Sequence, residues 1–110
     1  MGGVMAIVYV DDKNFEQEVS NFQKPKMVVF YAEWCPHCHR MVPVLEEVAK
    51  RYEGKVKVCV VNVSHAPKAA AKYAVRGVPT MLFFKDAKHS SQLVGEEPIK
   101  VIEEKIKGII

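Results

Sequence analysis

The chain of 110 residues lacks several features that would assign it to a specialised class. Its first apolar stretch ends at Asp11 and Asp12, too early for a membrane span, and no basic segment precedes it as a signal sequence requires. It has no internal repeat, and its lysines are scattered, so a net charge of +3 gives no reason to expect nucleic-acid binding. We therefore expect a single domain over residues 1–110 that works as a monomer in the cytoplasm, away from membranes.

Cysteine is also scarce, and the three that occur form an odd number, which argues against a framework of structural disulfides. Two of them are separated by two residues in the segment Trp34-Cys35-Pro36-His37-Cys38. Such a pair at the junction of a strand and a helix is typical of a redox-active dithiol. The third, Cys59, lies in a valine-rich stretch and is expected to be a small buried side chain without a redox role.

Two alternatives to a redox dithiol remain. With His39 added, the residues also match the Cys-x-x-Cys-His pattern of covalent haem attachment. The strand–helix context and the missing export signal disfavour haem. A closed zinc site needs four ligands, whereas the chain offers one cysteine pair. We therefore expect no metal and no cofactor beyond a reversible disulfide between Cys35 and Cys38.

The apolar pattern predicts an α/β protein in the order β-α-β-α-β-α-β-β-α. Strands are expected over 4–10, 27–31, 55–63, 80–85 and 90–94, and helices over 12–22, from 35 to about 54, over 66–73 and over 98–109. Asp12 is expected to cap the first helix. Alternation of strands and helices implies a mixed five-stranded sheet with its four helices on both faces, and the short last connection makes the final strand pair antiparallel.

The dithiol is expected at the start of the second helix. Pro36 suits the first helical position, where no backbone donor is needed, which leaves Cys35 as the N-cap. The free N–H groups and the dipole of the first turn then favour a Cys35 thiolate, and Cys35 is the expected nucleophile. Cys38 lies on the same face one turn inward, and we expect it to be more buried and to resolve the mixed disulfide.

Several separated motifs resemble the thioredoxin family in the right order over essentially the whole length. They are the segment from Phe30 to Cys35, the helix residue Pro43, the segment from Lys72 to Thr80, and Val94-Gly95. The resemblance implies a thioredoxin fold and a thiol-disulfide oxidoreductase that acts on protein disulfides and dithiols, with a thioredoxin-reductase-like electron donor as a partner. It also implies a cis bond before Pro79 and a substrate groove that binds an extended strand. The residues assigned to this groove are Trp34, Val78, Pro79 and Gly95.

The chain departs from the family pattern at the dithiol. Pro36-His37 replaces the usual Gly-Pro and is the dipeptide of periplasmic DsbA-type oxidases. A histidine beside the thiolate should stabilise the reduced form, so we predict a more oxidising potential than that of a typical thioredoxin. Val29 and Val60 stand where the family usually has a buried aspartate and a partly buried lysine, which predicts slower resolution by Cys38. Oxidase or isomerase work therefore stays an alternative to general reductase work.

Overall fold

The computed structural model describes residues 7–86 and 88–110. Its elements follow the expected order, with small changes at their ends; the proposed start of the first strand, residues 4–6, lies outside the described residues. The strands are β1 (Ile7–Val10), β2 (Lys26–Tyr31), β3 (Lys57–Asn62), β4 (Thr80–Phe84) and β5 (His89–Val94). The helices are a π-helical turn η1 (Glu16–Ser20), α1 (Pro36–Arg51), α2 (Pro67–Lys72) and α3 (Ile99–Lys107).

The five strands form one mixed sheet in the order β1-β3-β2-β4-β5. β3 runs parallel to both β1 and β2, whereas β4 is antiparallel to β2 and to β5. The central position of β2 follows from its composition, because an apolar run such as Met27 to Phe30 fits a strand that is covered on both faces. The predicted α/β class and thioredoxin fold are confirmed.

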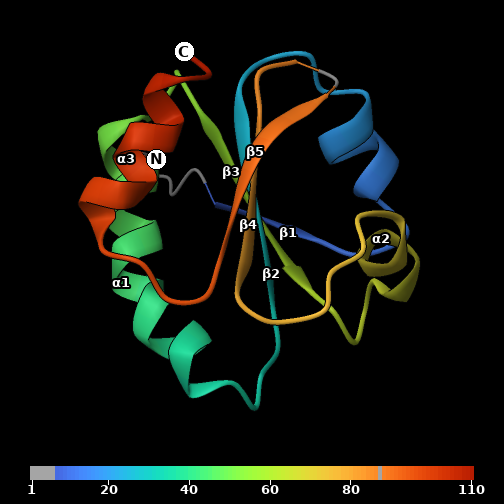
Figure 1. Cartoon of the computed structure of the whole chain (residues 1–110). Helices are drawn as coiled ribbons and strands as arrows, with labels where there is room; N and C mark the ends of the chain where they lie inside the picture. Colours follow the sequence, from blue (N-terminus) through green and yellow to red (C-terminus); the bar gives the residue numbers. More distant parts are fainter. Residues whose placement is uncertain (1–6, 87) are drawn as a thin grey trace, which may run out of the picture.

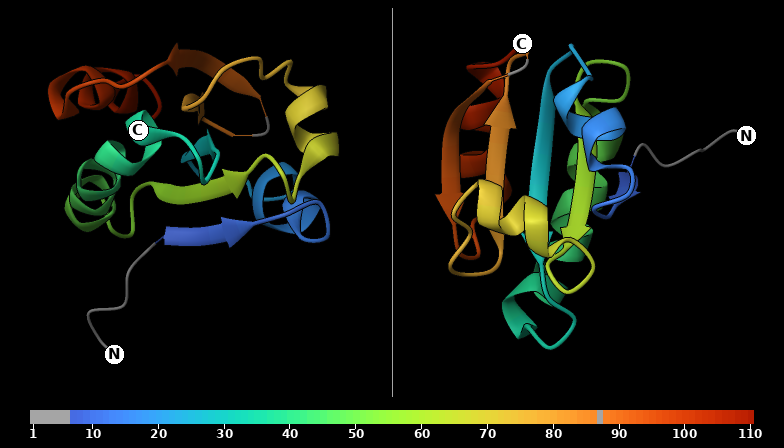
Figure 2. Two further views of the ribbon diagram at one scale, coloured as in Figure 1. Left: turned by 90° about the horizontal axis from the view of Figure 1, so that it is seen from below. Right: turned by 90° about the vertical axis from the view of Figure 1, so that its right-hand side faces the viewer.

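Two helical layers cover the sheet (Figure 1). α1 and α3 lie on one face, and α2 and the η1 segment lie on the other, as the two views of Figure 2 also show. Each layer encloses its own core: Val29, Met41 and Ile106 belong to the first, and Val28, Phe30 and Val61 to the second. Neighbouring residues of β2 therefore contribute to opposite cores, which is the two-residue period of a strand.

The first helix differs most from its expectation. Instead of spanning 12–22, its helical part is confined to a short segment around η1, and the role expected of Asp12 is wrong. The Asp12 carboxylate accepts hydrogen bonds from the backbone N–H groups of Lys68 and Ala69, both at 3.0 Å, and so caps α2. Ala66 at the N-cap of α2 has no side-chain acceptor of its own, so a residue distant in sequence supplies it.

The strand register brings three chain segments together at one edge of the sheet. The end of β2 lies beside the start of β4, where Phe30 pairs with Thr80, and Thr80 pairs in turn with Val94 at the end of β5. The loop from β2 to α1, the turn before β4 and the turn after β5 therefore meet at this edge. Among the described residues, no helix is long and apolar enough to span a bilayer.

Candidate active site

The dithiol lies where the loop after β2 enters α1. Cys35 is the N-cap, with an extended backbone (φ −90°, ψ 110°), and Pro36 occupies the first turn. The Cys35 sulfur accepts a hydrogen bond from the backbone N–H of Cys38 at 3.2 Å. The structure thus places this sulfur at the positive end of α1, where a free donor of the first turn points at it.

Both cysteines are thiols, and both are largely covered. Cys35 is 2% exposed and Cys38 is 6% exposed, so the expectation that Cys38 is the more buried residue is wrong. The reason is the turn before β4, which covers Cys35: its thiol donates a weak hydrogen bond to the Val78 carbonyl oxygen, 3.7 Å away. The exposed fraction of the whole residue therefore does not distinguish the two thiols. Any difference between them must come from the groups around each sulfur atom.

The surroundings of Cys38 keep it protonated. Burial, followed by its hydrogen bond with Cys35, raises the pKa of the Cys38 thiol to about 11. This direction favours the protonated thiol of Cys38 at neutral pH. Burial also raises the pKa of Cys59 to about 11, and this residue is fully enclosed in the second core, as expected for a structural thiol.

Three of the four predicted groove residues meet beside Cys35. The Val78–Pro79 peptide bond is cis, as the resemblance implied. The Gly95 N–H donates to the Pro79 carbonyl at 2.8 Å, and Gly95 has a φ of +98°, a conformation that glycine adopts without strain. Val78 and Gly95 line a groove together with His37. Trp34 does not line this groove, but it is 77% exposed directly before Cys35, as expected of a flanking aromatic side chain.

His37 takes part in a cluster of charged groups that the sequence did not reveal. Its Nδ1 atom lies 3.0 Å from a carboxylate oxygen of Glu96 and 2.8 Å from Nη2 of Arg40. The Arg40 Nε–H donates to the same Glu96 oxygen at 3.0 Å. These hydrogen bonds, from His37 first and Arg40 second, hold the pKa of Glu96 below its usual value. The only sequence signals for this cluster were the three-residue spacing of His37 and Arg40 on α1 and the position of Glu96 after Gly95.

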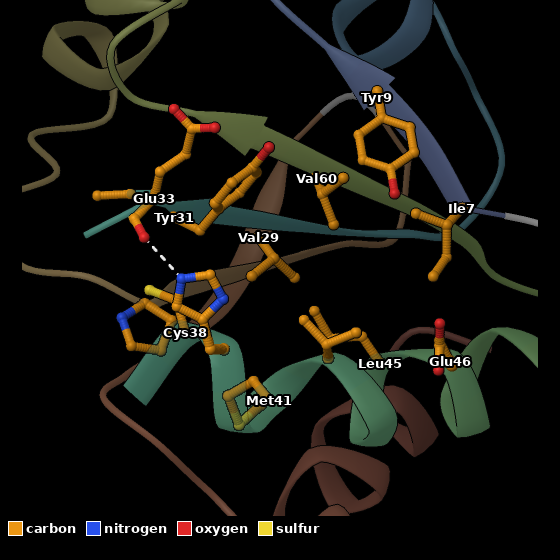
Figure 3. Close-up of a pocket in the computed structure, with 14 residues that line it drawn as sticks. Ile7, Tyr9, Val29, Tyr31, Glu33, Cys38, Met41, Leu45, Glu46 and Val60 are labelled. Atoms are coloured by element: carbon orange, nitrogen blue, oxygen red, sulfur yellow. Dashed lines mark hydrogen bonds between the residues drawn. The ribbon is translucent and has the colours of Figure 1, made fainter. Parts of the chain in front are cut away.

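The opposite side of the dithiol is apolar (Figure 3). Val29 and Val60 are paired neighbours in β2 and β3, and they face Met41 and Leu45 of α1 across a cavity of about 250 Å³. Cys38 lies at one end of this cavity. At its rim, Nε2 of His39 donates to the Glu33 carbonyl at 2.6 Å, the dashed line in Figure 3. Beneath Cys38 the structure therefore has two valine side chains and no acid–base pair among the residues of the cavity floor.

Residues 7–86 and 88–110 contain no group of three or more His, Cys, Asp or Glu side chains arranged to hold a metal ion. The chemistry that the site itself supports is exchange between two thiols and a disulfide, which needs only the paired sulfurs. A helix-start dithiol beside a cis-proline turn on this sheet defines a thiol-disulfide oxidoreductase that works without a cofactor.

Comparison with known proteins gives the family. The thioredoxin family model matches residues 6–108. Thioredoxin from Pseudomonas aeruginosa is 45% identical over 89 residues, which cover 81% of this chain and 82% of that protein. Thioredoxin from Acidithiobacillus ferridurans is 42% identical over 90 residues, 82% of this chain and 83% of that protein. The chloroplastic M-type thioredoxin of Pisum sativum is 34% identical over 97% of this chain but only 62% of its own length. The chain belongs to the thioredoxin family.

Proposed function

We propose that Cys35 is the attacking nucleophile and Cys38 the resolving thiol in exchange with protein disulfides. The observation that supports these roles is the Cys38 N–H bond to the Cys35 sulfur at the start of α1. A thiolate at Cys35 attacks one sulfur of the substrate disulfide, and the other substrate sulfur leaves as a thiolate. Cys38 then loses its proton and attacks the Cys35 sulfur, which forms the internal disulfide and releases the second substrate thiolate.

The groove beside Cys35 fits an extended substrate segment. Val78 presents its carbonyl oxygen toward the Cys35 sulfur, and the Pro79 carbonyl is already occupied by the Gly95 N–H. A substrate strand that pairs with the backbone at Val78 would bring its sulfur to Cys35. Trp34, exposed on the chain just before Cys35, supplies a rigid aromatic surface at the same edge.

A trapping experiment tests the two roles. With Cys38→Ser, a protein substrate should accumulate as a mixed disulfide through Cys35, because resolution is blocked after the first step. With Cys35→Ser, no such species should form, since Cys38 is held as a thiol. Trapping through Cys38 in the Cys35→Ser protein, at a rate similar to that of Cys35, would contradict the assignment.

Resolution is the step that this chain makes difficult. The Cys38 proton must leave before attack, and Val29 offers no carboxylate to take it. Water, a backbone path or the departing substrate thiolate must therefore accept the proton. We expect the chain to release good leaving groups quickly and poor ones slowly.

Pro36 and His37 set the redox poise in this proposal. His37 adjoins the Cys35 thiolate along the chain, and positive charge there stabilises the reduced protein, which makes its disulfide a stronger oxidant. The contacts with Glu96 and Arg40 moderate this effect, because they hold the His37 ring and place a carboxylate beside it. The chain should still be more oxidising than a Gly-Pro thioredoxin.

A dipeptide swap tests the poise. The double substitution Pro36→Gly with His37→Pro should lower the equilibrium constant for oxidation of glutathione by about tenfold, which corresponds to about 30 mV. An unchanged constant would show that the dipeptide does not set the potential. The catalytic roles of Cys35 and Cys38 would survive that outcome, since the trapping experiment tests them separately.

The direction of disulfide exchange and the compartment in which it takes place belong together. We propose that residues 1–110 act as one monomeric domain in the cytoplasm, where a thioredoxin-reductase-like donor reduces the dithiol and the chain reduces protein disulfides. The odd cysteine number and the family membership support this setting. A more oxidising potential favours the second candidate, in which the same dithiol works as a disulfide oxidase or isomerase. Reduction of the disulfide by a purified thioredoxin reductase separates the two.

A further inference from the structure

The cavity behind Cys38 has an apolar interior and a polar rim. Figure 3 shows Val29 and Val60 on the sheet side and Met41 and Leu45 on the helix side. Each of these four side chains is at most 7% exposed. No charged side chain belongs to this interior: the charged lining residues Glu33 and Glu46 are exposed, as is His39.

The cavity adjoins the groove proposed for the protein substrate: Met41 lines both, and Pro79, which follows Val78 in the chain, also lines the cavity. The groove lies between α1 and the turns at Val78 and Gly95, whereas the cavity lies between α1 and the strands β1, β2 and β3. Its outer part is formed by Ile7 and by Tyr9, whose side chain is 73% exposed. Cys38 lines only the cavity, whereas Val78 and Gly95 line only the groove, so a ligand in the cavity could reach Cys38 and leave that part of the groove open.

Size and charge limit what the cavity can hold. An apolar cavity of about 150 Å³ in another protein binds benzene. The volume here, about 250 Å³, suits a substituted single ring or a branched hydrocarbon of similar bulk. The valine floor gives a charged group no partner, and the rim carboxylates of Glu33 and Glu46 repel an anion.

We propose that this cavity is a binding site for small, uncharged apolar molecules, such as a substituted single aromatic ring, and that its occupation slows resolution by Cys38. Occupation covers the Cys38 thiol from the cavity side and so keeps solvent from reaching its proton. The first step at Cys35 takes place on the far side of the dithiol and proceeds at its usual rate. A ligand at this site would therefore hold the protein in its mixed disulfide with substrate.

Toluene and benzoate are matched probes for binding, because they share a ring and differ in charge. Toluene should shift the NMR methyl signals of Val29, Val60 and Leu45 with a dissociation constant of about 1 mM or lower, as expected for a ligand of seven heavy atoms. The methyl signals of Val19, which is buried in the second core, should not move. Benzoate should leave all four residues unchanged.

Two substitutions of Val60 test whether the cavity is the site. Val60→Phe fills it, and Val60→Lys brings a charge to its floor at a position where the family usually carries a lysine. Both should lose toluene binding by at least about tenfold, and far-ultraviolet circular dichroism should confirm that they are folded. The proposal is overturned if wild type shows no shifts, if benzoate binds as well as toluene, or if both folded variants keep the wild-type affinity.

The kinetic consequence is measured on the wild-type mixed disulfide. Saturating toluene should slow release of the substrate from Cys35 several-fold and leave the rate of its formation unchanged, and Val60→Phe should show no response to toluene. Equal slowing of formation and release would contradict the coupling to Cys38. Because binding is read from NMR, failure of the site and failure of the redox proposal are distinguishable.

Discussion

Cys35 lies on the side of the dithiol that presents hydrogen-bond donors and charged groups, whereas Cys38 lies on the side that presents methyl groups. The Cys35 sulfur receives an N–H at the start of α1, and the next turn carries His37 and Arg40 against Glu96. Cys38 borders a cavity floored by Val29 and Val60. One helical turn therefore separates a site that favours an anion from a site that disfavours one. The overall burial of the two thiols is nearly equal, so the difference in their surroundings is what supports the proposed direction of attack.

The largest effect is expected at Cys59, which shows what burial alone does to a thiol. Its pKa is raised from 9.0 to about 11 in the folded protein. The stability from this group is present in full below about pH 9 and is lost as the pH rises toward 11, because the unfolded chain ionises first. Two pKa units correspond to about 2–3 kcal/mol.

Cys59→Val isolates that contribution. Denaturant unfolding at several pH values should show the free energy of unfolding of wild type falling more steeply above about pH 9 than that of the variant. Parallel curves for wild type and Cys59→Val would show that burial does not raise the pKa of Cys59. Burial would then also fail as the explanation for the raised pKa of Cys38.

A smaller effect is expected when the apolar side is given a base. Val29→Asp places a carboxylate beside Cys38 and should speed resolution of the mixed disulfide by about tenfold at neutral pH, because a positioned base can take the proton. The variant should also be less stable, since Val29 is buried.

Val29→Asn is the matched control for that change. Asparagine has nearly the same shape as aspartate, but its amide accepts no proton near neutral pH. Val29→Asn should therefore leave the rate of resolution close to that of wild type. Equal rates for Val29→Asp, Val29→Asn and wild type would remove proton transfer as the limiting feature of the apolar side.

The smallest effect is expected on the polar side. Glu96→Gln removes a negative charge that contacts His37 and Arg40 in the first turn of the helix that begins after Cys35. The balance shifts toward a stabilised Cys35 thiolate, so the equilibrium constant for oxidation of glutathione should rise by about two- to fivefold, the range of an exposed ion pair.

Glu97→Gln is the neighbouring control, because it removes the same charge without a contact to His37 among the described hydrogen bonds. It should move the constant less than Glu96→Gln does. A fall in the constant for Glu96→Gln would contradict the predicted direction, and an equal change in both variants would show that the contact with His37 makes no difference.

The sequence predicted the parts of this molecule that depend on neighbouring residues. β2 could be predicted because an uninterrupted apolar run fits a strand at the centre of a sheet that is covered on both faces. The start of α1 could be predicted because Pro36 follows Cys35. The contacts that were missed join residues far apart in the chain. Asp12 caps a helix 56 residues away, and Glu96 reaches His37 across 59 residues, so only the folded sheet brings them together.

The same reason explains the burial of Cys35. Local pattern placed Cys38 further into the helix, but the cover over Cys35 comes from Val78, which is 43 residues further along the chain. The sequence shows valines at positions 29 and 60, where the family usually has charged residues. It does not show the cavity between these valines and α1, because the size of the cavity depends on the distance between the helix and the sheet.

The central claim is the asymmetry of the two thiols, and alkylation of the reduced wild-type protein measures it directly. Iodoacetamide is added at a series of pH values, and peptide mass spectrometry locates the label. Near neutral pH the label should appear on Cys35, while Cys38 should react only as the pH approaches about 11, the value to which its pKa is raised. Labelling of Cys38 at neutral pH as fast as Cys35, or before it, would contradict the account.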